Sequence, residues 1–258
     1  MSTIKQVVAA TVLSAAAVAP GPAGAQSQPI LKGVKNIVLV HGAFADGSSW
    51  AKVIPLLQAK GLNVTAVQNP LVSLEEDVAA TQRAIALMEG PVLLVGHSYG
   101  GMVISEAGND PKVAGLVYVC ALIPNDGQSV VDVTQAFPPA PGSAEFRQDD
   151  AGFLRLSPKG INEHFAQDLS AAERGVLVAT QTPWAAKATV AKISTAAWKT
   201  RPAWCIIGTE DQMVPPDLAR AEAAMIKAKT TELASSHVPM VSMPEKVAAI
   251  IVNAAQEL

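Results

Sequence analysis

The chain has 258 residues, of which 50% are hydrophobic and 16% are charged, a composition typical of one domain with a large buried core. The formal net charge is only −3, and aromatic residues make up 4% of the chain. A basic surface for phosphates and an aromatic platform for bases are both missing from this pattern, so nucleic acid is not an expected partner.

The first 25 residues have the pattern of a secretory signal peptide. Lys5 gives a positive start, residues 7–19 form an apolar run, and Ala23-Gly-Ala25 is a small-residue cleavage site. An uncleaved membrane anchor is the alternative, but the run is shorter than the ~20 residues that a span needs, and prolines interrupt it. We therefore expect an exported protein, periplasmic or secreted, whose mature chain starts near Gln26 without stable membrane association.

Strand and helix patterns alternate through the first half of the mature chain. Asn36-Ile-Val-Leu-Val40 predicts a buried strand that ends in His41-Gly-Ala-Phe44. Apolar residues at helical spacing predict helices over residues 49–60 and 77–88, each followed by a glycine. This alternation is typical of a parallel sheet with helices on both faces.

The most specific motif follows the next strand, residues 91–95. Gly96-His-Ser-Tyr-Gly100 is a G-x-S-x-G sequence, which predicts a tight turn from strand to helix that presents Ser98 in a cleft. A Cβ at Gly96 or Gly100 would clash where strand and helix cross closely. The turn also points the backbone N–H of Tyr99 toward whatever Ser98 attacks. A helix over residues 99–107 completes the pattern.

The two cysteines are expected to be free thiols. Cys120 lies late in a predicted strand, residues 113–120, and Cys205 lies early in the next core strand. A disulfide is chemically possible in an exported protein, but the two positions would be out of register by several ångströms at ~3.3 Å per residue. Neither cysteine shows the spacing of a metal ligand.

Residues 125–199 break the alternation and predict a small helical cap inserted between core strands. Short helices are expected over residues 170–180 and 182–192. Such an insertion excludes water and shapes a pocket above the nucleophile. Of its aromatic residues, Phe137 and Trp184 are the expected pocket residues, although packing between cap and sheet would explain each of them equally.

Two more strand-to-loop transitions carry candidate catalytic groups. The strand over residues 203–208 runs into a loop that holds Asp211. The strand over residues 230–234 is followed by a loop with His237, and then by a final helix over residues 244–258. A serine hydroxyl is a poor nucleophile by itself, and it needs a base that an acid holds in place.

These motifs together resemble the α/β-hydrolase superfamily and, within it, the branch of plant methyl esterases, hydroxynitrile lyases and small bacterial relatives. The resemblance covers about residues 35–258 and implies one α/β-hydrolase domain over residues 26–258. It is carried by five segments: His41-Gly-Ala-Phe44, Ser48-Ser-Trp50, the G-x-S-x-G sequence, Gly208-Thr-Glu-Asp211 and Ser236-His-Val-Pro-Met-Val-Ser-Met-Pro244.

The resemblance implies a role for each matched residue. The chain order of the fold is nucleophile, acid, base, which corresponds to Ser98, Asp211 and His237. Asp126, after the preceding strand, is the alternative acid. The loop after the first strand implies Ala43 as the second backbone N–H of the oxyanion hole, beside Tyr99. His41 precedes the nucleophile, so a structural role is favoured over that of a base.

The branch contains both esterases and lyases, and two positions favour the esterases. Its lyases carry Thr at the position of Gly42 and Lys directly after the catalytic histidine, where this chain has Val238. A lyase needs positive charge near the departing cyanide. We expect Gly42 to leave open space for an acyl group or water, and Val238 and Phe44 to add apolar walls to the pocket.

The sequence therefore predicts a serine hydrolase of the carboxylesterase type that acts on a small-molecule acyl substrate through an acyl-enzyme, with no cofactor and no metal. Two alternatives remain: a ligand-binding sensor on the same fold, or a cofactor-free perhydrolase, lyase, lactonase or amidase. The pattern leaves the oligomeric state open, with a dimer as one option.

Overall fold

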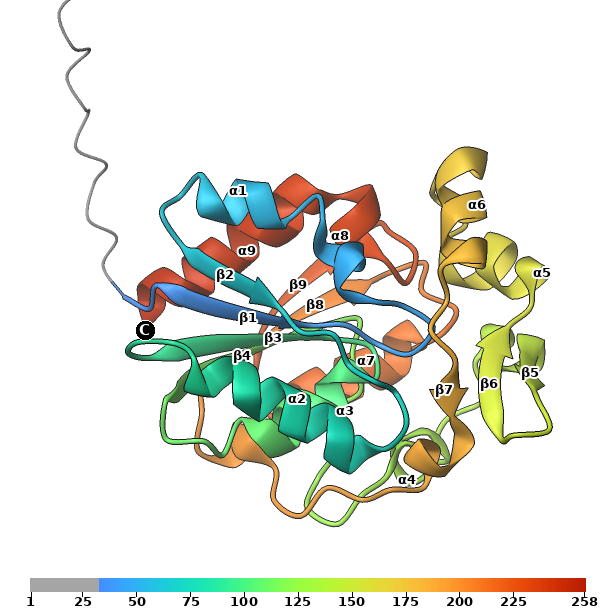
Figure 1. Ribbon diagram of the computed structural model, residues 1–258, viewed down its shortest axis with the longest axis horizontal. Helices are drawn as coiled ribbons and strands as arrows, with labels where there is room; N and C mark the ends of the chain where they lie inside the picture. The colour runs from blue at the N-terminus through green and yellow to red at the C-terminus, as the bar shows by residue number, and fades with distance from the viewer. Residues whose placement is uncertain (1–32) are drawn as a thin grey trace, which may run out of the picture. The chain divides into compact units, whose positions relative to one another are not determined.

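The computed structural model describes residues 33–258, and the predicted signal peptide lies outside these described residues. Six strands form one parallel sheet in the order β2-β1-β3-β4-β8-β9 (Figure 1). Their bounds are β1 (Asn36–Val40), β2 (Asn63–Ala66), β3 (Val92–His97), β4 (Val113–Val119), β8 (Ala203–Gly208) and β9 (Lys229–Leu233). All residues of β1 and β3 are buried, because the sheet is covered on both faces.

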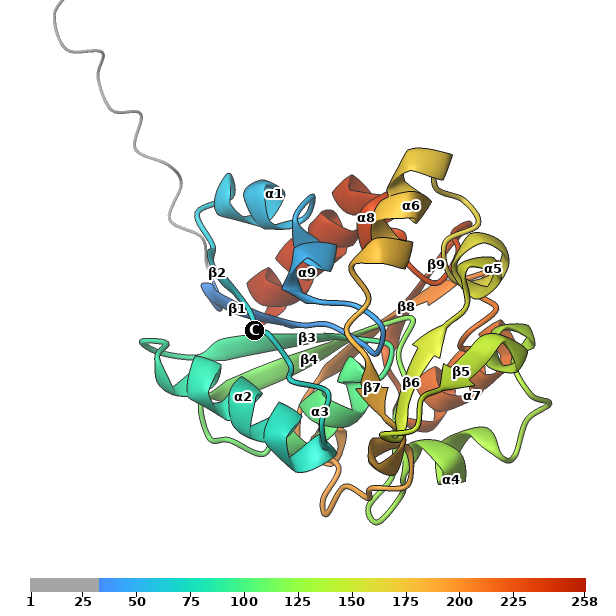
Figure 2. The same cartoon turned by 45° about the vertical axis from the view of Figure 1, so that its right-hand side comes forward.

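Helices cover the two faces of this sheet. The helices of the core are α1 (Ile54–Gln58), α2 (Leu74–Ala86), α3 (Gly100–Ala107), α7 (Pro216–Met225), α8 (Pro239–Ser242) and α9 (Pro244–Glu257). Figures 1 and 2 show α1 and α9 on one face and α2 and α3 on the other. The predicted parallel sheet with helices on both faces is confirmed.

Two details near the start of the sheet differ from the prediction. The helix expected over residues 49–60 is a 3-10 helix, Gly47–Trp50, followed by the shorter α1. Pro55 is the physical reason, since it lacks an N–H donor and is accommodated only in the first turn of a helix. Strand β2 was not predicted, because this edge strand is only partly buried and its sequence shows no apolar run.

The chain between β4 and β8 forms the cap, which lies beyond the carboxyl ends of the parallel strands (Figure 1). It contains α4 (Val130–Thr134), β5 (Phe146–Gln148), β6 (Phe153–Leu156), α5 (Pro158–Gly160), a π-helix (Ile161–Phe165), α6 (Ala171–Ala179) and β7 (Trp184–Ala185). The three strands form an antiparallel sheet in the order β5-β6-β7. The cap is therefore a mixed structure and not the helical one that the sequence predicted.

The prediction of a helix over residues 182–192 is wrong. Residues 184–185 pair with β6, and only Ala186–Thr189 form a 3-10 helix. Pro183 disfavours the helical conformation for Thr182. The helix expected over residues 170–180 is α6, which begins with a capping box between Ser170 and Glu173.

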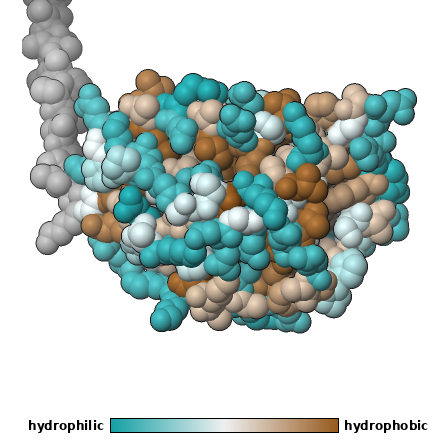
Figure 3. All heavy atoms as spheres, turned by 90° about the horizontal axis from the view of Figure 1, so that it is seen from below, coloured by the Kyte–Doolittle hydropathy of each residue, from teal (hydrophilic) through white to brown (hydrophobic). Residues whose placement is uncertain are grey.

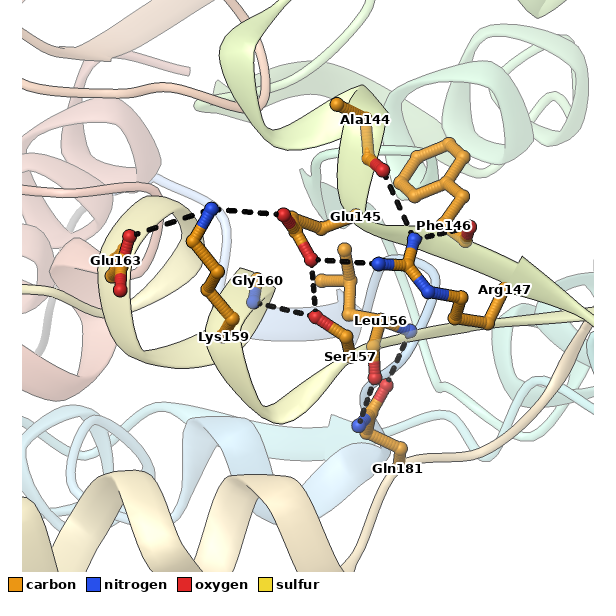
Figure 4. A network of polar contacts seen from close by, with 10 residues as sticks. All are labelled: Ala144, Glu145, Phe146, Arg147, Leu156, Ser157, Lys159, Gly160, Glu163 and Gln181. Atoms are coloured by element: carbon orange, nitrogen blue, oxygen red, sulfur yellow. Dashed lines mark hydrogen bonds and ion pairs between the residues drawn. The ribbon is translucent and has the colours of Figure 1, made fainter.

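A polar network holds the cap sheet together around Glu145 (Figure 4). Its carboxylate accepts hydrogen bonds from Ser157 Oγ at 2.5 Å and Arg147 at 3.1 Å, and Lys159 Nζ lies at 3.2 Å. These donors lower the pKa of Glu145, with Ser157 as the largest cause. The network connects the turn before β5 with the end of β6, and so fixes the strands that carry Phe146 and Leu154.

The remaining features concern the surface and the thiols. The face in Figure 3 is mainly hydrophilic, with apolar side chains exposed in smaller groups between the polar ones. Within residues 33–258 none of the helices is long and apolar enough to cross a membrane.

Cys120 and Cys205 are buried and free, as predicted. Cys205 pairs in register with Tyr118, two residues before Cys120, which accounts for the absence of a disulfide.

Candidate active site

Ser98 lies in a strained turn between β3 and α3. Its φ angle is +54°, in the left-handed region that side chains other than glycine rarely adopt. A Cβ at Gly96 would lie 2.6 Å from the carbonyl oxygen of Gly100, and a Cβ at Gly100 would lie 2.7 Å from that of Val40. The two glycines are therefore required by the close crossing of strand and helix, as the sequence predicted.

Ala43 and Tyr99 follow two neighbouring strands, β1 and β3. Strand β2 lies on one side of β1 and β3 lies on the other, so the order in which strands are added to the sheet reverses here. Open α/β sheets form a crevice at such a point. Both residues border the same cavity as Ser98. Among the hydrogen bonds of residues 33–258, none uses the backbone N–H of Ala43 or of Tyr99 as donor. Two uncommitted N–H groups thus lie beside the serine.

Asp211 and His237 are brought together from loops after β8 and β9. His237 Nδ1 lies 2.8 Å from Asp211 Oδ2, and both side chains are almost completely buried. The other carboxylate oxygen of Asp211 accepts the backbone N–H groups of Met213 and Val214 at 2.8 and 2.9 Å. The carboxylate is therefore fixed on one side and presents its free oxygen to the imidazole.

His97 contacts the backbone of the loop that carries His237. Its Nε2 lies 2.8 Å from the carbonyl oxygen of His237, and the two rings are 4.6 Å apart. Complete burial lowers the pKa of His97 well below its ordinary value, with the nearby His237 as the next cause. His97 is thus a neutral imidazole that donates from Nε2 to a backbone oxygen. No sequence signal besides its place as the second residue of the G-x-S-x-G motif points to this contact.

The cap also contacts the loops that carry Asp211 and His237. Asp168 accepts the backbone N–H of Ser236 at 3.0 Å, and Gln167 donates to the carbonyl oxygen of Glu210 at 2.6 Å. The ring of Phe165 lies 5.1 Å from the imidazole of His237. One segment of the cap therefore positions both loops, a contribution that the sequence analysis did not identify.

Ser98 and His237 border one cavity of about 620 Å³. Among the described residues no hydrogen bond joins the serine hydroxyl to the imidazole. Catalytic hydrogen bonds of this kind are often long in the free enzyme and tighten only when substrate is present. Ser98 and His237 thus border the same cavity, and Asp211 contacts the imidazole through Nδ1.

The cavity has an apolar and uncharged lining. Phe44, Phe137 and Trp184 contribute to it, as the sequence predicted. Further walls come from α4, from the cap sheet and from the loop after Asp211, namely Val130, Val131, Phe146, Leu154, Met213 and Val214. No Asp, Glu, Lys or Arg side chain is among the lining residues of the described chain.

Val238 does not border the cavity, in contrast to the prediction. Its side chain is buried in the hydrophobic core. The backbone turns at this residue into α8, and the turn directs the side chain into the core while His237 borders the cavity.

The open space expected at Gly42 is also absent. A Cβ at this position would lie 2.6 Å from Ser98 Cβ and 2.9 Å from the carbonyl oxygen of His97. Gly42 therefore allows the first loop to pass directly over the turn that carries the nucleophile. The close approach leaves no room for a threonine side chain in this conformation.

A buried carboxylate, Asp77, contacts the side chain of Tyr99. Asp77 Oδ2 accepts the hydroxyl of Tyr99 at 2.9 Å, and Asp77 Oδ1 accepts the N–H of Leu71 at 2.8 Å. Burial raises the pKa of Asp77 to about 6, against the opposing effect of both hydrogen bonds. The Tyr99 ring also packs on Trp184 at 4.9 Å, so the pair connects the nucleophile turn with the cap.

His41 and Asp126, the other candidate base and acid in the sequence, do not border the cavity. His41 is completely buried, with Nδ1 bonded to the carbonyl oxygen of Gly42 and Nε2 to the N–H of Asn69, and burial lowers its pKa. Asp126 lies on the surface in an ion pair with Lys199. Within residues 33–258 no group of three or more His, Cys, Asp or Glu residues is placed to hold a metal ion.

The fold and this site together define a hydrolase of the α/β class, and comparison with known proteins agrees. A model of the alpha/beta hydrolase family matches residues 37–250, so the chain belongs to this family. The pyrethroid hydrolase of Sphingobium wenxiniae is 36% identical over 107 residues, 36% of this chain and 38% of that protein.

Plant relatives lie in the branch that the motifs indicated. Methylesterase 8 of Arabidopsis thaliana is 31% identical over 43% of this chain and 46% of that protein. The alpha-hydroxynitrile lyase of the same plant is 28% identical over 52% of this chain and 60% of that protein. The chain thus matches less than two-thirds of the length of these curated relatives. A solved pyrethroid hydrolase from Sphingobium faniae JZ-2 superimposes with a TM-score of 0.72 at 25% identity, over 86% of this chain and 97% of that one.

Proposed function

We propose that the protein is a serine carboxylesterase whose catalytic residues are Ser98, His237 and Asp211. The observation that carries the proposal is one cavity bordered by Ser98, by the imidazole that Asp211 holds at 2.8 Å, and by two uncommitted backbone N–H groups. These are the parts that acyl transfer to a serine requires: a nucleophile, a base with an orienting acid, and donors for the oxyanion.

The mechanism follows from the positions of these groups. Since Asp211 accepts from Nδ1 of His237, the proton of the neutral ring is held on Nδ1, and Nε2 is free to take the proton of Ser98. Ser98 Oγ attacks the ester carbonyl, and the N–H groups of Ala43 and Tyr99 hold the oxygen on which negative charge develops. His237 then gives its proton to the leaving alcohol, and water repeats both steps on the acyl-enzyme.

The cavity favours a bulky, uncharged and apolar ester as substrate. Its walls contain five aromatic side chains besides Tyr99 and His237, and no formally charged side chain among the described residues. A charged substrate would lose its hydration without gaining a partner, which costs several kcal/mol. The proteins named pyrethroid hydrolase and methylesterase among the relatives support ester chemistry on this scaffold.

The lyase alternative is weakened by the same lining. Cyanide would leave as an anion, and within residues 33–258 no Lys or Arg borders the cavity to hold it. Lys246, the nearest cation after His237 in the sequence, is exposed on α9. The sensor, perhydrolase, lactonase and amidase alternatives are separated from the esterase by turnover measurements.

The test is a set of p-nitrophenyl esters of increasing acyl length, with mandelonitrile as the lyase substrate. Ester turnover should exceed cyanide release and should be lost in Ser98→Ala. Binding of the esters without turnover would instead identify a sensor. Efficient cyanide release with weak ester turnover, both lost in Ser98→Ala, would identify a lyase.

We also propose that the protein is exported. The support is the pattern of Lys5, the apolar run and Ala23-Gly-Ala25, which lies outside the described residues. N-terminal sequencing of protein from its native host should begin near Gln26. An intact N-terminus on active protein in the cytoplasmic fraction would refute export.

A further inference from the structure

Phe44 lies between two cavities. The catalytic cavity of about 620 Å³ and a second cavity of about 200 Å³ have one lining residue in common among the residues described, and it is Phe44. The side chain is only 5% exposed. It therefore separates the two spaces and does not border open solvent.

The ring of Phe44 is held from the side of the catalytic cavity. Phe146 lies 5.2 Å and Trp184 5.9 Å from it, measured between ring centroids. Its backbone has a φ angle of +62°, a strained conformation for a residue with a bulky side chain. Such a conformation persists where the surrounding structure holds the residue, and the two ring contacts with the cap are part of those surroundings.

The second cavity has a mixed lining, in which apolar residues alternate with polar and charged ones. The polar and charged lining residues are Asp46, Ser48, Ser49, Lys52, Glu173 and Thr180. It lies between the loop after β1 and the cap helix α6, and α8 contributes Val241 to its lining. Leu177, Val241 and the 60% exposed Val176 supply part of the apolar surface. At its rim Lys52 Nζ forms an ion pair with Glu173 at 2.6 Å, which connects α6 to the core. A few methylene groups of an apolar chain can lie against the apolar part of this lining, next to Leu177 and Val241.

We propose that Phe44 is a specificity-determining residue that limits the length of the apolar chain an ester substrate can have, and that the second cavity is a latent subsite for such a chain. The inference rests on the proposed esterase function. In the native protein the ring closes the catalytic cavity on this side. When the ring is removed, the two cavities join, and a longer chain passes through to Val176 and Leu177.

The test compares long and short esters in two variants, Phe44→Ala and Phe44→Gly. The glycine variant also relieves the strain at φ +62°, so it is the safer variant for folding. The readout is the ratio of kcat/KM for a long ester to that for a short one. A ratio is used because Phe44 adjoins Ala43, the proposed oxyanion donor, so that its removal can change the turnover of long and short esters alike. Two series are used, one lengthened on the acyl side and one on the alcohol side.

The expected result is a rise in this ratio in one of the two series. Each buried methylene contributes about 0.8 kcal/mol, which is about fourfold in kcat/KM. Three additional methylene groups in the second cavity therefore predict a rise on the order of 10- to 100-fold. Thermal melts of each variant establish that it is folded.

Leu177→Trp provides the matched control, because it fills the second cavity without touching the first. Combined with Phe44→Ala, it should return the ratio to the wild-type value, and alone it should leave the ratio unchanged. An unchanged ratio in folded Phe44→Ala and Phe44→Gly, or a gain that Leu177→Trp does not cancel, would overturn the inference while the Ser98-dependent esterase activity remains. Absence of any Ser98-dependent ester turnover in the wild type would instead refute the proposed function.

Discussion

Replacement of Asp77 by Asn should stabilise the protein in a manner that depends on pH. Asp77 is completely buried in α2, and none of the ion pairs recorded within residues 33–258 includes it. Burial raises its pKa from 3.8 to about 6, so the fold carries an ionised carboxylate at neutral pH that it accommodates poorly. Asn is isosteric and neutral. Its oxygen can accept from Leu71, and its amide can donate to the hydroxyl of Tyr99.

The direction and the size of the effect on the free energy of unfolding follow from the folded-state and unfolded-state pKa values of Asp77. A raised folded-state pKa means that the native state binds the proton more tightly than the unfolded state. The free energy of unfolding therefore falls as pH rises from about 3.8 through about 6. A shift of roughly two pKa units corresponds to about 3 kcal/mol, of which about 2 kcal/mol appears between pH 4.5 and 8. The Asn variant has no carboxyl group at position 77, so its free energy of unfolding does not fall for this reason as pH rises.

The assay is denaturant unfolding of wild type and Asp77→Asn between pH 4.5 and 8. The difference between the two proteins is the quantity of interest, since buried His41 and His97, with lowered pKa values, change stability in the opposite direction over part of this range. We expect the advantage of the Asn variant to grow with pH and to level off above pH 6 to 7. A difference that is constant with pH would refute the raised pKa of Asp77.

Three further predictions concern the catalytic groups and the turn above them. Ser98→Ala and His237→Ala should each lower kcat by 10⁴- to 10⁶-fold, on the order seen in other serine triads, in steady-state assays with an ester, while thermal melts stay near the wild type. Asp211→Asn should lower kcat by about 10⁴-fold, whereas the matched Asp126→Asn should leave it within a few-fold; the reverse pattern would place the acid at Asp126. Gly42→Ala should lower both stability, by about 1–3 kcal/mol, and kcat, because its Cβ would meet Ser98 Cβ at 2.6 Å. The matched control for Gly42→Ala is Gly175→Ala in α6, whose new Cβ would meet no described atom within 4 Å beyond its chain neighbours and its own helix backbone, so denaturant unfolding should show unchanged or slightly higher stability.

The sequence by itself determined the features that depend on local patterns. The apolar runs of β1, β3, β4 and β8 predicted buried parallel strands, because only a sheet covered on both faces needs such runs. The G-x-S-x-G motif predicted the tight turn at Ser98, since few sequences fit a turn in which strand and helix cross so closely. Chain order then indicated Asp211 and His237 as its partners.

Tertiary structure decided the contacts between distant segments. The bond from His97 to the backbone of His237 joins residues 140 positions apart, and the pair of Asp77 and Tyr99 joins residues 22 positions apart. Neither pair has a local signal, because each side chain alone resembles an ordinary polar residue of a strand or helix. The cap strands were missed for a related reason: two residues of β7 carry too little pattern, and pairing with β6 outweighs local propensity.

The shape of the pocket depended on the same long-range packing. Sequence indicated Phe44, Phe137 and Trp184 as lining residues but also Val238, which the turn into α8 directs into the core. The position of Phe44 between two cavities depends on the approach of α6 to the loop after β1. Local sequence specifies which backbone turns are possible, but the volume left between packed elements depends on the side chains of all of them at once.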